Sequence, residues 1–141
     1  MLSEKAGFTL IELMIVVVII GILAAMAIPN MLAMQARAKE AGVKSNMHTL
    51  QLALEDFAVQ SNGFYPDDGT STTPGGQTII DVCPGGVYPN NPFTGAETVV
   101  SWDADPASSG EVGINPALED HYIIKGFGRD AILLMTLQEG T

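Results

Sequence analysis

The chain has 141 residues, enough for a single domain after an apolar leading segment. It is acidic, with 16 Asp and Glu against 6 Lys and Arg, and residues 62–141 hold eleven acids against two bases, Lys125 and Arg129. Such a surface repels phosphate backbones, so no nucleic-acid partner is expected. The single cysteine, Cys83, excludes a disulfide within the chain.

The first predicted element is an apolar helix. Residues 1–7 are a short polar head, and the run from Leu13 to Ile28 has no polar side chain. From Phe8 to Met34 the segment is longer than the ~20 residues that a helix needs to cross a bilayer. Gly21 and Pro29 weaken a helix, but membrane helices tolerate both residues better than soluble helices do. We therefore predict a membrane-spanning helix.

The helical period continues beyond Pro29. An apolar stripe follows at alternating spacings of four and three residues: Val43, Met47, Leu50, Leu54 and Phe57. Polar residues on another face are expected to be solvated: Lys44, His48, Gln51 and Glu55. Residues 61–63, Ser-Asn-Gly, supply a stop signal. The sequence thus predicts one helix from about Thr9 to about Gln60, roughly 75–80 Å long and too long for a small globule.

Short strands are predicted after this helix, at residues 78–82, 98–102, 122–125 and 131–137. The last two flank a five-residue hairpin connection, 126–130, whereas residues 66–78, 88–95 and 103–116 have the composition of loops. A sheet of these strands needs cover on one face, and the apolar stripe is the available partner. The predicted fold class is α+β, with the distal half of the long N-terminal helix (about 9–60) packed on a small antiparallel sheet of 3–4 strands.

No catalytic constellation is found. The sequence has no CxxC, HExxH, GxGxxG or P-loop pattern. His48 lies on the polar helix face, and Cys83 has no basic neighbour in the sequence that would lower its pKa. We predict that the protein is not an enzyme and has no catalytic residues.

Two acidic segments contain residue types that bind metal ions. His121 follows Glu119 and Asp120, but three adjacent residues of a strand cannot all face one ion. The carboxylates of residues 103–111 are of the type that calcium prefers, yet they lack the spacing of an EF-hand loop. Calcium in the head is therefore unsupported, and no metal or other cofactor is predicted.

Glu12 stands out within the apolar segment. Near the membrane interface a carboxylate is tolerated, but deep in hydrocarbon a charge costs roughly 2.5–3.5 kcal/mol and such residues usually face a partner. No Lys or Arg lies between Lys5 and Arg37, so a cationic partner has to come from elsewhere. An α-amino group is one source, and cutting after Gly7 would create one at Phe8.

Residues 5–30, KAGFTLIELMIVVVIIGILAAMAIPN, resemble the N-terminus of type IV prepilins and of type II secretion pseudopilins. The resemblance implies cleavage by a prepilin peptidase between Gly7 and Phe8, N-methylation of Phe8, and pairing of Glu12 with the N-terminal amine of a neighbouring subunit. The apolar helix would pack in the filament core, an assembly role that includes Gly21 and Pro29. The matching features are a leader ending in Gly7, then Phe8, Thr9, Leu10 and Glu12, then the helix with Gly21 and Pro29.

The same resemblance implies three parts: a leader (1–7), a transmembrane and filament-core half of the helix (8–35), and a globular head (36–141). Before assembly the chain would be a single-pass protein of the bacterial inner membrane with its leader in the cytoplasm, and afterwards part of a periplasmic or extracellular filament. Expected partners are identical or homologous pilin subunits, the prepilin peptidase, an inner-membrane assembly platform and membrane lipid. Only one cation, Lys5, lies on the leader side of the span, whereas Arg37, Lys39 and Lys44 follow it. This distribution is opposite to the positive-inside tendency.

The type of filament stays open. Residues 45–68 and 88–95 resemble segments of the major pseudopilin and of some short-headed pilins. The C-terminal end, 126–141, lacks the acidic, glycine-rich ending that ligates calcium in such pseudopilins, and the lone Cys83 excludes the disulfide loop of many major pilins.

Two other interpretations remain. Residues 1–27 have features of a secretory signal peptide, with Leu13–Leu23 as its apolar core and cleavage after Ala27, which would release a periplasmic domain. A membrane-anchored domain that does not polymerise shares the predicted span but leaves Glu12 unexplained.

Overall fold

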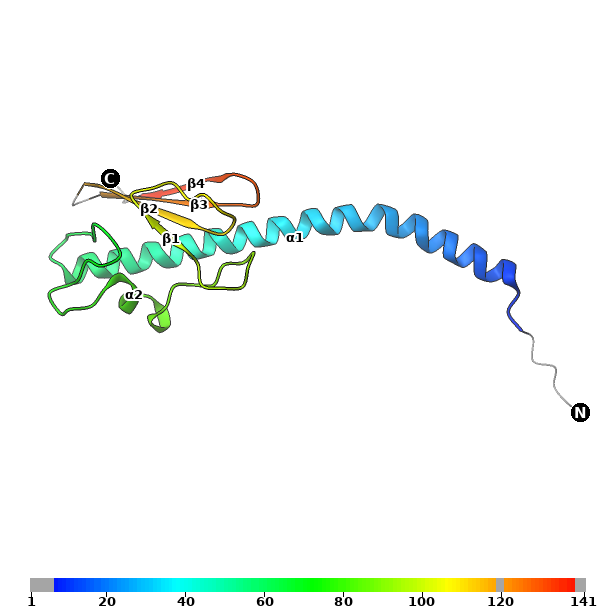
Figure 1. Cartoon of the computed structure of the whole chain (residues 1–141), viewed down its shortest axis with the longest axis horizontal. Coiled ribbons are helices and arrows are strands. Elements are labelled where there is room, and N and C mark those ends of the chain that lie inside the picture. The colour runs from blue at the N-terminus through cyan, green and yellow to red at the C-terminus, as the bar shows by residue number, and fades with distance from the viewer. Residues whose placement is uncertain (1–6, 119–120, 139–141) are drawn as a thin grey trace, which may run out of the picture. The chain divides into compact units, whose positions relative to one another are not determined.

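The computed structural model of the protein describes residues 7–118 and 121–138. The chain divides into two compact units, one that ends at Ala36 and one that begins at Arg37, and helix α1 contributes residues to both. The elements in chain order are helix α1 (Leu10–Gln60), helix α2 (Ile79–Val82), the 3-10 turn η1 (Pro84–Gly86) and strands β1 (Val100–Trp102), β2 (Val112–Leu118), β3 (His121–Phe127) and β4 (Ile132–Gln138) (Figure 1).

The predicted long helix is confirmed as α1, which has 51 residues and contains Pro29. In the unit that ends at Ala36, every large hydrophobic side chain from Phe8 to Met34 is between 46 and 86 % exposed. By length and composition this helix can cross a membrane. An apolar surface of this extent requires lipid or other protein around it.

The predicted stop signal ends α1. Asn62 adopts a left-handed conformation with φ 58°, and the N–H of Gly63 donates to the carbonyl of Ala58 at 2.8 Å. This is the hydrogen bond of a Schellman motif, which satisfies a carbonyl at the end of a helix.

In the second unit the four strands form one sheet in the order β1-β2-β3-β4. Strands β2, β3 and β4 pair antiparallel, but β1 pairs parallel to β2, with Val100 opposite Val112. The small sheet is therefore mixed, and the prediction of a wholly antiparallel sheet is wrong for β1. The reason is that residues 103–111 form a crossover connection, so that β2 runs in the same direction as β1. The crossover begins at Asp103, whose φ is 53°.

Two of the local predictions were wrong. Residues 78–82, predicted as a strand, contain helix α2, because the carboxylate of Asp81 accepts hydrogen bonds from the N–H and hydroxyl of Thr78 at 2.8 and 2.7 Å, which caps a helix. Strand β2 lies mostly within residues 103–116, which were predicted to be a loop. The strands predicted at 98–102, 122–125 and 131–137 are confirmed, with small differences at their ends.

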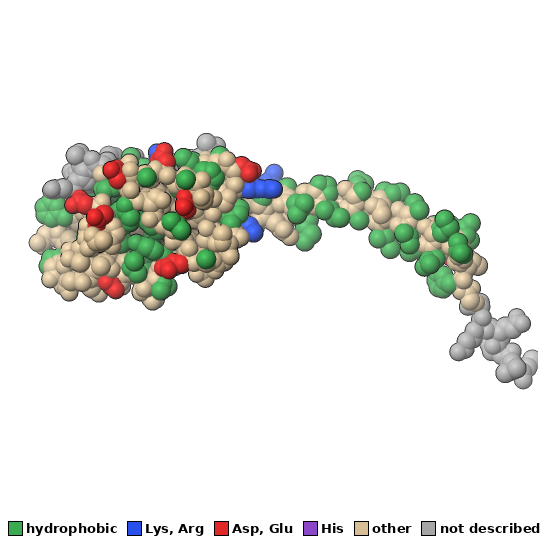
Figure 2. All heavy atoms as spheres, viewed as in Figure 1, with side chains coloured by type: hydrophobic (Ala, Val, Ile, Leu, Met, Phe, Trp, Pro, Cys, Tyr) green, Lys and Arg blue, Asp and Glu red, His purple; other side chains and the backbone are tan. Residues whose placement is uncertain are grey.

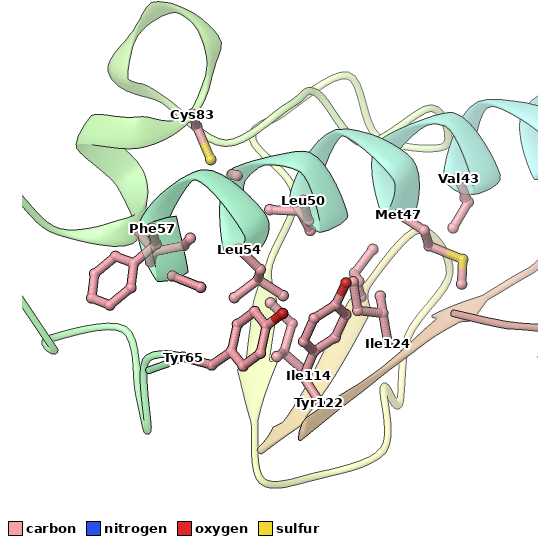
Figure 3. Close-up of a cluster of buried hydrophobic side chains, with 14 residues drawn as sticks. Val43, Met47, Leu50, Leu54, Phe57, Tyr65, Cys83, Ile114, Tyr122 and Ile124 are labelled. Atoms are coloured by element: carbon pink, nitrogen blue, oxygen red, sulfur yellow. The ribbon is translucent and has the colours of Figure 1, made fainter. Parts of the chain in front are cut away.

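The predicted packing of α1 on the sheet is confirmed. Gly126 of β3 lies so close to α1 that a Cβ atom there would be 2.7 Å from Sδ of Met47. In the second unit the sheet lies on one side of α1, and α2 with the segment around Cys83 lies on the other (Figures 1 and 3). The buried core joins the stripe Val43, Met47, Leu50, Leu54 and Phe57 to Val112, Ile114, Tyr122 and Ile124 of the sheet (Figure 3).

The prediction that Glu55 is solvated is wrong. The carboxylate of Glu55 accepts hydrogen bonds from the hydroxyls of Tyr65 and Tyr122, at 3.0 and 2.5 Å, and is partly buried. The two tyrosine rings meet edge to face, with centroids 4.8 Å apart. Glu55 therefore connects α1 both to the segment that follows it and to β3.

Candidate assembly site

The start of α1 is a capping box. Thr9 directly precedes the first helical residue, and its backbone N–H and hydroxyl donate to Oε2 of Glu12 at 2.9 and 2.8 Å. In return the N–H of Glu12 donates to Oγ1 of Thr9 at 3.3 Å. Reciprocal bonds of this kind satisfy backbone donors that a helix start leaves unpaired.

The sequence-based prediction gave Glu12 a cationic partner and did not include this partner within its own chain. The signal was available, because Thr9 and Glu12 match the spacing [ST]-x-x-E that marks a capping box. The structure thus gives Glu12 two neutral donors from its own chain. It leaves the carboxylate exposed, so a second partner has access to it.

Gly7 and Phe8 lie before the helix, outside its hydrogen-bonded turns. The Phe8 side chain is 86 % exposed, and among the described residues no atom beyond Gly7 and its chain neighbours lies within 4 Å of the position that a Cβ atom of Gly7 would take. The peptide bond between them is therefore accessible from the surroundings.

Gly21 and Pro29 lie inside α1. A Cβ atom at Gly21 would meet nothing within 4 Å, so contacts within the described chain do not require glycine there. Pro29 removes a backbone donor from the middle of the helix. The structure brings neither residue into contact with Glu12.

The carboxylates considered for calcium engage separate partners. Asp105 accepts a 2.6 Å hydrogen bond from Nζ of Lys125, and Glu111 accepts the N–H groups of Ala107 and Ser108, both at 2.7 Å. Within residues 7–118 and 121–138, no group of three or more His, Cys, Asp or Glu is placed to hold a metal ion. Glu119 and Asp120 lie outside the described residues.

Cys83 does not have the environment of a nucleophile. It is 3 % exposed, and burial, followed by the negative charge of Glu97, raises the pKa of its thiol to about 11. A thiol with such a pKa stays protonated at neutral pH, whereas the reactive form is the thiolate.

The comparisons with known proteins agree with this geometry. A family described as the prokaryotic N-terminal methylation motif matches residues 2–28. The type IV major pilin protein PilA of Myxococcus xanthus is 49 % identical over 75 residues, which cover 47 % of this chain and 34 % of PilA. The type II secretion system core protein G of Pseudomonas aeruginosa is 35 % identical over 88 residues, or 62 % of this chain and 58 % of that protein.

A second core protein G, from Klebsiella michiganensis, is 33 % identical over 135 residues, and the match covers 84 % of this chain and 91 % of that protein. No solved structure matches the chain. The long apolar helix and small sheet define a pilin-like structural class. Together with these relatives they show that the chain belongs to the family of type IV pilins and type II secretion pseudopilins. The chain spans only about a third of PilA and 58 % of the Pseudomonas protein.

Proposed function

We propose that the chain is a structural subunit, not an enzyme, that polymerises through α1 into a type II secretion pseudopilus or a type IV pilus. The observation that carries this proposal is the exposed apolar surface between Phe8 and Met34, most of which lies within the methylation motif matched at residues 2–28. Before assembly this surface is covered by lipid of the bacterial inner membrane, with the leader in the cytoplasm. After assembly it is covered by the same surface of other subunits in a periplasmic or extracellular filament.

Processing prepares the subunit for assembly. A prepilin peptidase cuts the accessible bond between Gly7 and Phe8 and methylates the new amine of Phe8. Removal of the leader also removes Lys5 and leaves a positively charged amine on Phe8, four residues before Glu12, at the start of the mature protein. An inner-membrane assembly platform then receives the processed subunit.

Glu12 changes partners during assembly. In the single chain its carboxylate is held by two neutral donors of Thr9. The N-terminal amine of a neighbouring subunit offers a charged donor, and charge-assisted hydrogen bonds are roughly twice as strong as neutral ones. Two unit charges 4 Å apart attract by about 4 kcal/mol at an effective dielectric of 20, before desolvation is subtracted. The capping box thus keeps the carboxylate satisfied until that neighbour arrives.

Gly21 and Pro29 serve the packing of α1 between subunits. Gly21 has open space around it in the single chain, which supports close approach by a helix of another subunit. Pro29 leaves one carbonyl of the helix without its usual donor, which permits a local change of helix geometry in the filament.

The size of the head favours the secretion pseudopilus. The match covers 91 % of the Klebsiella core protein G but 34 % of PilA, which supports a head like that of core protein G. Deleting the gene should then abolish export of secreted proteins. Loss of surface pili with normal export would assign the chain to a type IV pilus instead.

Glu12→Gln is the sharpest test of the assembly site. Glutamine keeps the oxygen that accepts the Thr9 bonds, so the helix cap is retained, but the negative charge is lost. We expect cleavage after Gly7 to continue and filaments in the sheared fraction to disappear. Glu4→Gln, in the leader, is the matched control and should assemble normally. Normal filaments from Glu12→Gln would refute the pairing role.

A further inference from the structure

Basic residues are concentrated in the part of α1 that directly follows its apolar segment. Of the six Lys and Arg in the chain, three fall within eight residues directly after that run: Arg37, Lys39 and Lys44, here called the basic collar. All three side chains are exposed. Residues 45–141 hold thirteen Asp and Glu but only Lys125 and Arg129 as bases. In Figure 2 most of the visible Lys and Arg atoms gather around α1, and acidic atoms are spread over the rest of the head.

The described part of the chain holds no ion-pair partner within 4.0 Å of the basic collar. Lys125 is paired with Asp105 at 2.6 Å and Arg129 faces Asp130 at 3.8 Å, but among the described residues no ion pair involves a collar cation. Lys39 lies 5.5 Å from the ring centroid of Phe93, which leaves its charge in place. Glu40 is the one acid among residues 37–44, so this segment carries a net charge of three minus one, or +2.

The spacing along α1 places these charges at the height of lipid headgroups. The 22 residues from Leu13 to Met34 are ~33 Å long as a helix, close to the ~30 Å of a hydrocarbon core. Arg37 then follows ~4–5 Å further along the axis and Lys44 ~15 Å further. The headgroup layer is ~5–8 Å thick on each side, and long basic side chains reach back toward it. The surface potential extends a further ~8 Å at physiological ionic strength.

We propose that the basic collar binds phospholipid headgroups of net negative charge while the unassembled subunit is in the membrane. This inference rests on the proposed membrane-inserted stage and adds the lipid class that the subunit recognises. The acidic remainder of the head is repelled by the same surface, so the head is held with its collar toward the membrane. It also gives a role to cations whose position opposes the positive-inside tendency.

The test uses the full chain in phosphatidylcholine vesicles that contain a small amount of phosphatidylglycerol, with spin-labelled forms of both lipids. Electron spin resonance gives the association constant of each labelled lipid with the protein. Arg37→Gln with Lys44→Gln removes two collar charges, and Lys39 is left unchanged because it contacts Phe93. The matched control, Gln60→Glu with Gln77→Glu, changes the net charge by the same amount at two exposed positions outside the collar.

We expect the wild type and the control to prefer phosphatidylglycerol severalfold, up to about fivefold per collar cation, since each Lys or Arg near an anionic surface is worth ~1 kcal/mol. The preference should fall toward one in Arg37→Gln with Lys44→Gln, and in the wild type at high salt. An equal preference in the wild type and this double variant would overturn the inference.

Two further outcomes separate this inference from the proposed function. In the first, the wild-type chain inserts into vesicles without any lipid preference, and its collar variant fails to form filaments. This result would mean that the collar binds the acidic head of a second copy. The lipid inference would then be wrong and the filament function would stand. A chain that does not insert into phosphatidylcholine vesicles at all would remove the membrane-inserted stage, and both proposals would fail.

Discussion

The carboxylate of Glu12 accepts hydrogen bonds from both the backbone N–H and the hydroxyl of Thr9, at 2.9 and 2.8 Å. The residue that is hardest to explain in an apolar helix is therefore satisfied by its own chain before any neighbour is present. This bonding caps the start of α1 and leaves the carboxylate of Glu12 exposed.

Replacing Thr9 with Val should loosen the start of α1. Valine has a similar shape but lacks the hydroxyl that bonds Glu12, and losing such a cap typically costs ~1 kcal/mol. We expect faster hydrogen exchange at the amides of Glu12 and Leu13, which bond the hydroxyl and the carbonyl of Thr9, measured on the full chain in detergent. Thr49→Val removes a hydroxyl that bonds Ser45 in the middle of the helix and should leave these amides unchanged. Equal exchange in Thr9→Val and wild type would contradict a structural role for the capping box.

Replacing Gly126 with Ala should destabilise the head. A Cβ atom there would lie 2.7 Å from Sδ of Met47 and 2.8 Å from Cγ1 of Val43, so α1 and β3 would have to separate. Overpacking of this kind typically lowers the free energy of unfolding by ~1–3 kcal/mol, measured by denaturant titration. Gly75→Ala is the matched control, because its nearest atom would be 3.6 Å away. Gly126→Ala as stable as this control would show that the helix and sheet are not so closely packed.

The hydrogen bond between Tyr122 and Glu55 should appear as a coupling energy. Tyr122→Phe and Glu55→Ala each remove one partner of a 2.5 Å bond. Because hydrogen bonds to charged groups are worth ~1.5–3 kcal/mol, we expect the double variant to be less destabilised than the sum of the single variants by about that amount. Tyr88→Phe with Glu55→Ala serves as the control pair and should be additive. Additive effects for Tyr122 and Glu55 would mean that their bond does not stabilise the head.

Alkaline pH should destabilise the fold through Cys83. Burial raises the pKa of its thiol from the ordinary value of 9.0 to about 11, so the unfolded chain releases this proton first. Between these values the folded state binds more protons, and the free energy of unfolding falls as pH rises; the contribution is fully present below pH 9.

Cys83→Ala should remove this slope between pH 9 and pH 10. Tyr88, whose pKa burial raises from 10.0 to about 12, adds a separate loss at higher pH, so Tyr88→Phe should flatten only that later part. Unfolding titrations at a series of pH values measure both. A slope in Cys83→Ala equal to that of the wild type would contradict the buried, protonated thiol.

The helix was predictable because local signals agree over its whole length. The apolar run, the stripe from Val43 to Phe57 and the turn at residues 61–63 each indicate the same element. The parallel pairing of β1 was not predictable, because it depends on a crossover that starts from Asp103 at positive φ. Strand β2 was hidden by Gly113 and Pro116, residues that usually mark loops but here lie within a sheet.

The assembly site was only partly predictable. Gly7, Phe8 and Glu12 were chosen on a resemblance and on the high cost of a charge in hydrocarbon, and their roles stay predictions. The bond from Thr9 to Glu12 is local and its spacing was readable in the sequence. The hydrogen bonds from Tyr65 and Tyr122 to Glu55 could not be predicted, because they join residues up to 67 positions apart and depend on the tertiary fold.

The central claim is that this chain matures into a filament subunit whose free amine is that of Phe8. Mass spectrometry of the mature protein from its native host tests it most directly. We predict an N-terminal peptide that begins at Phe8 and carries one added methyl group on its amine. A mature chain that begins at Ile28 would instead show a signal peptide cut after Ala27 and would contradict the account, as would a chain that keeps its leader in assembled filaments.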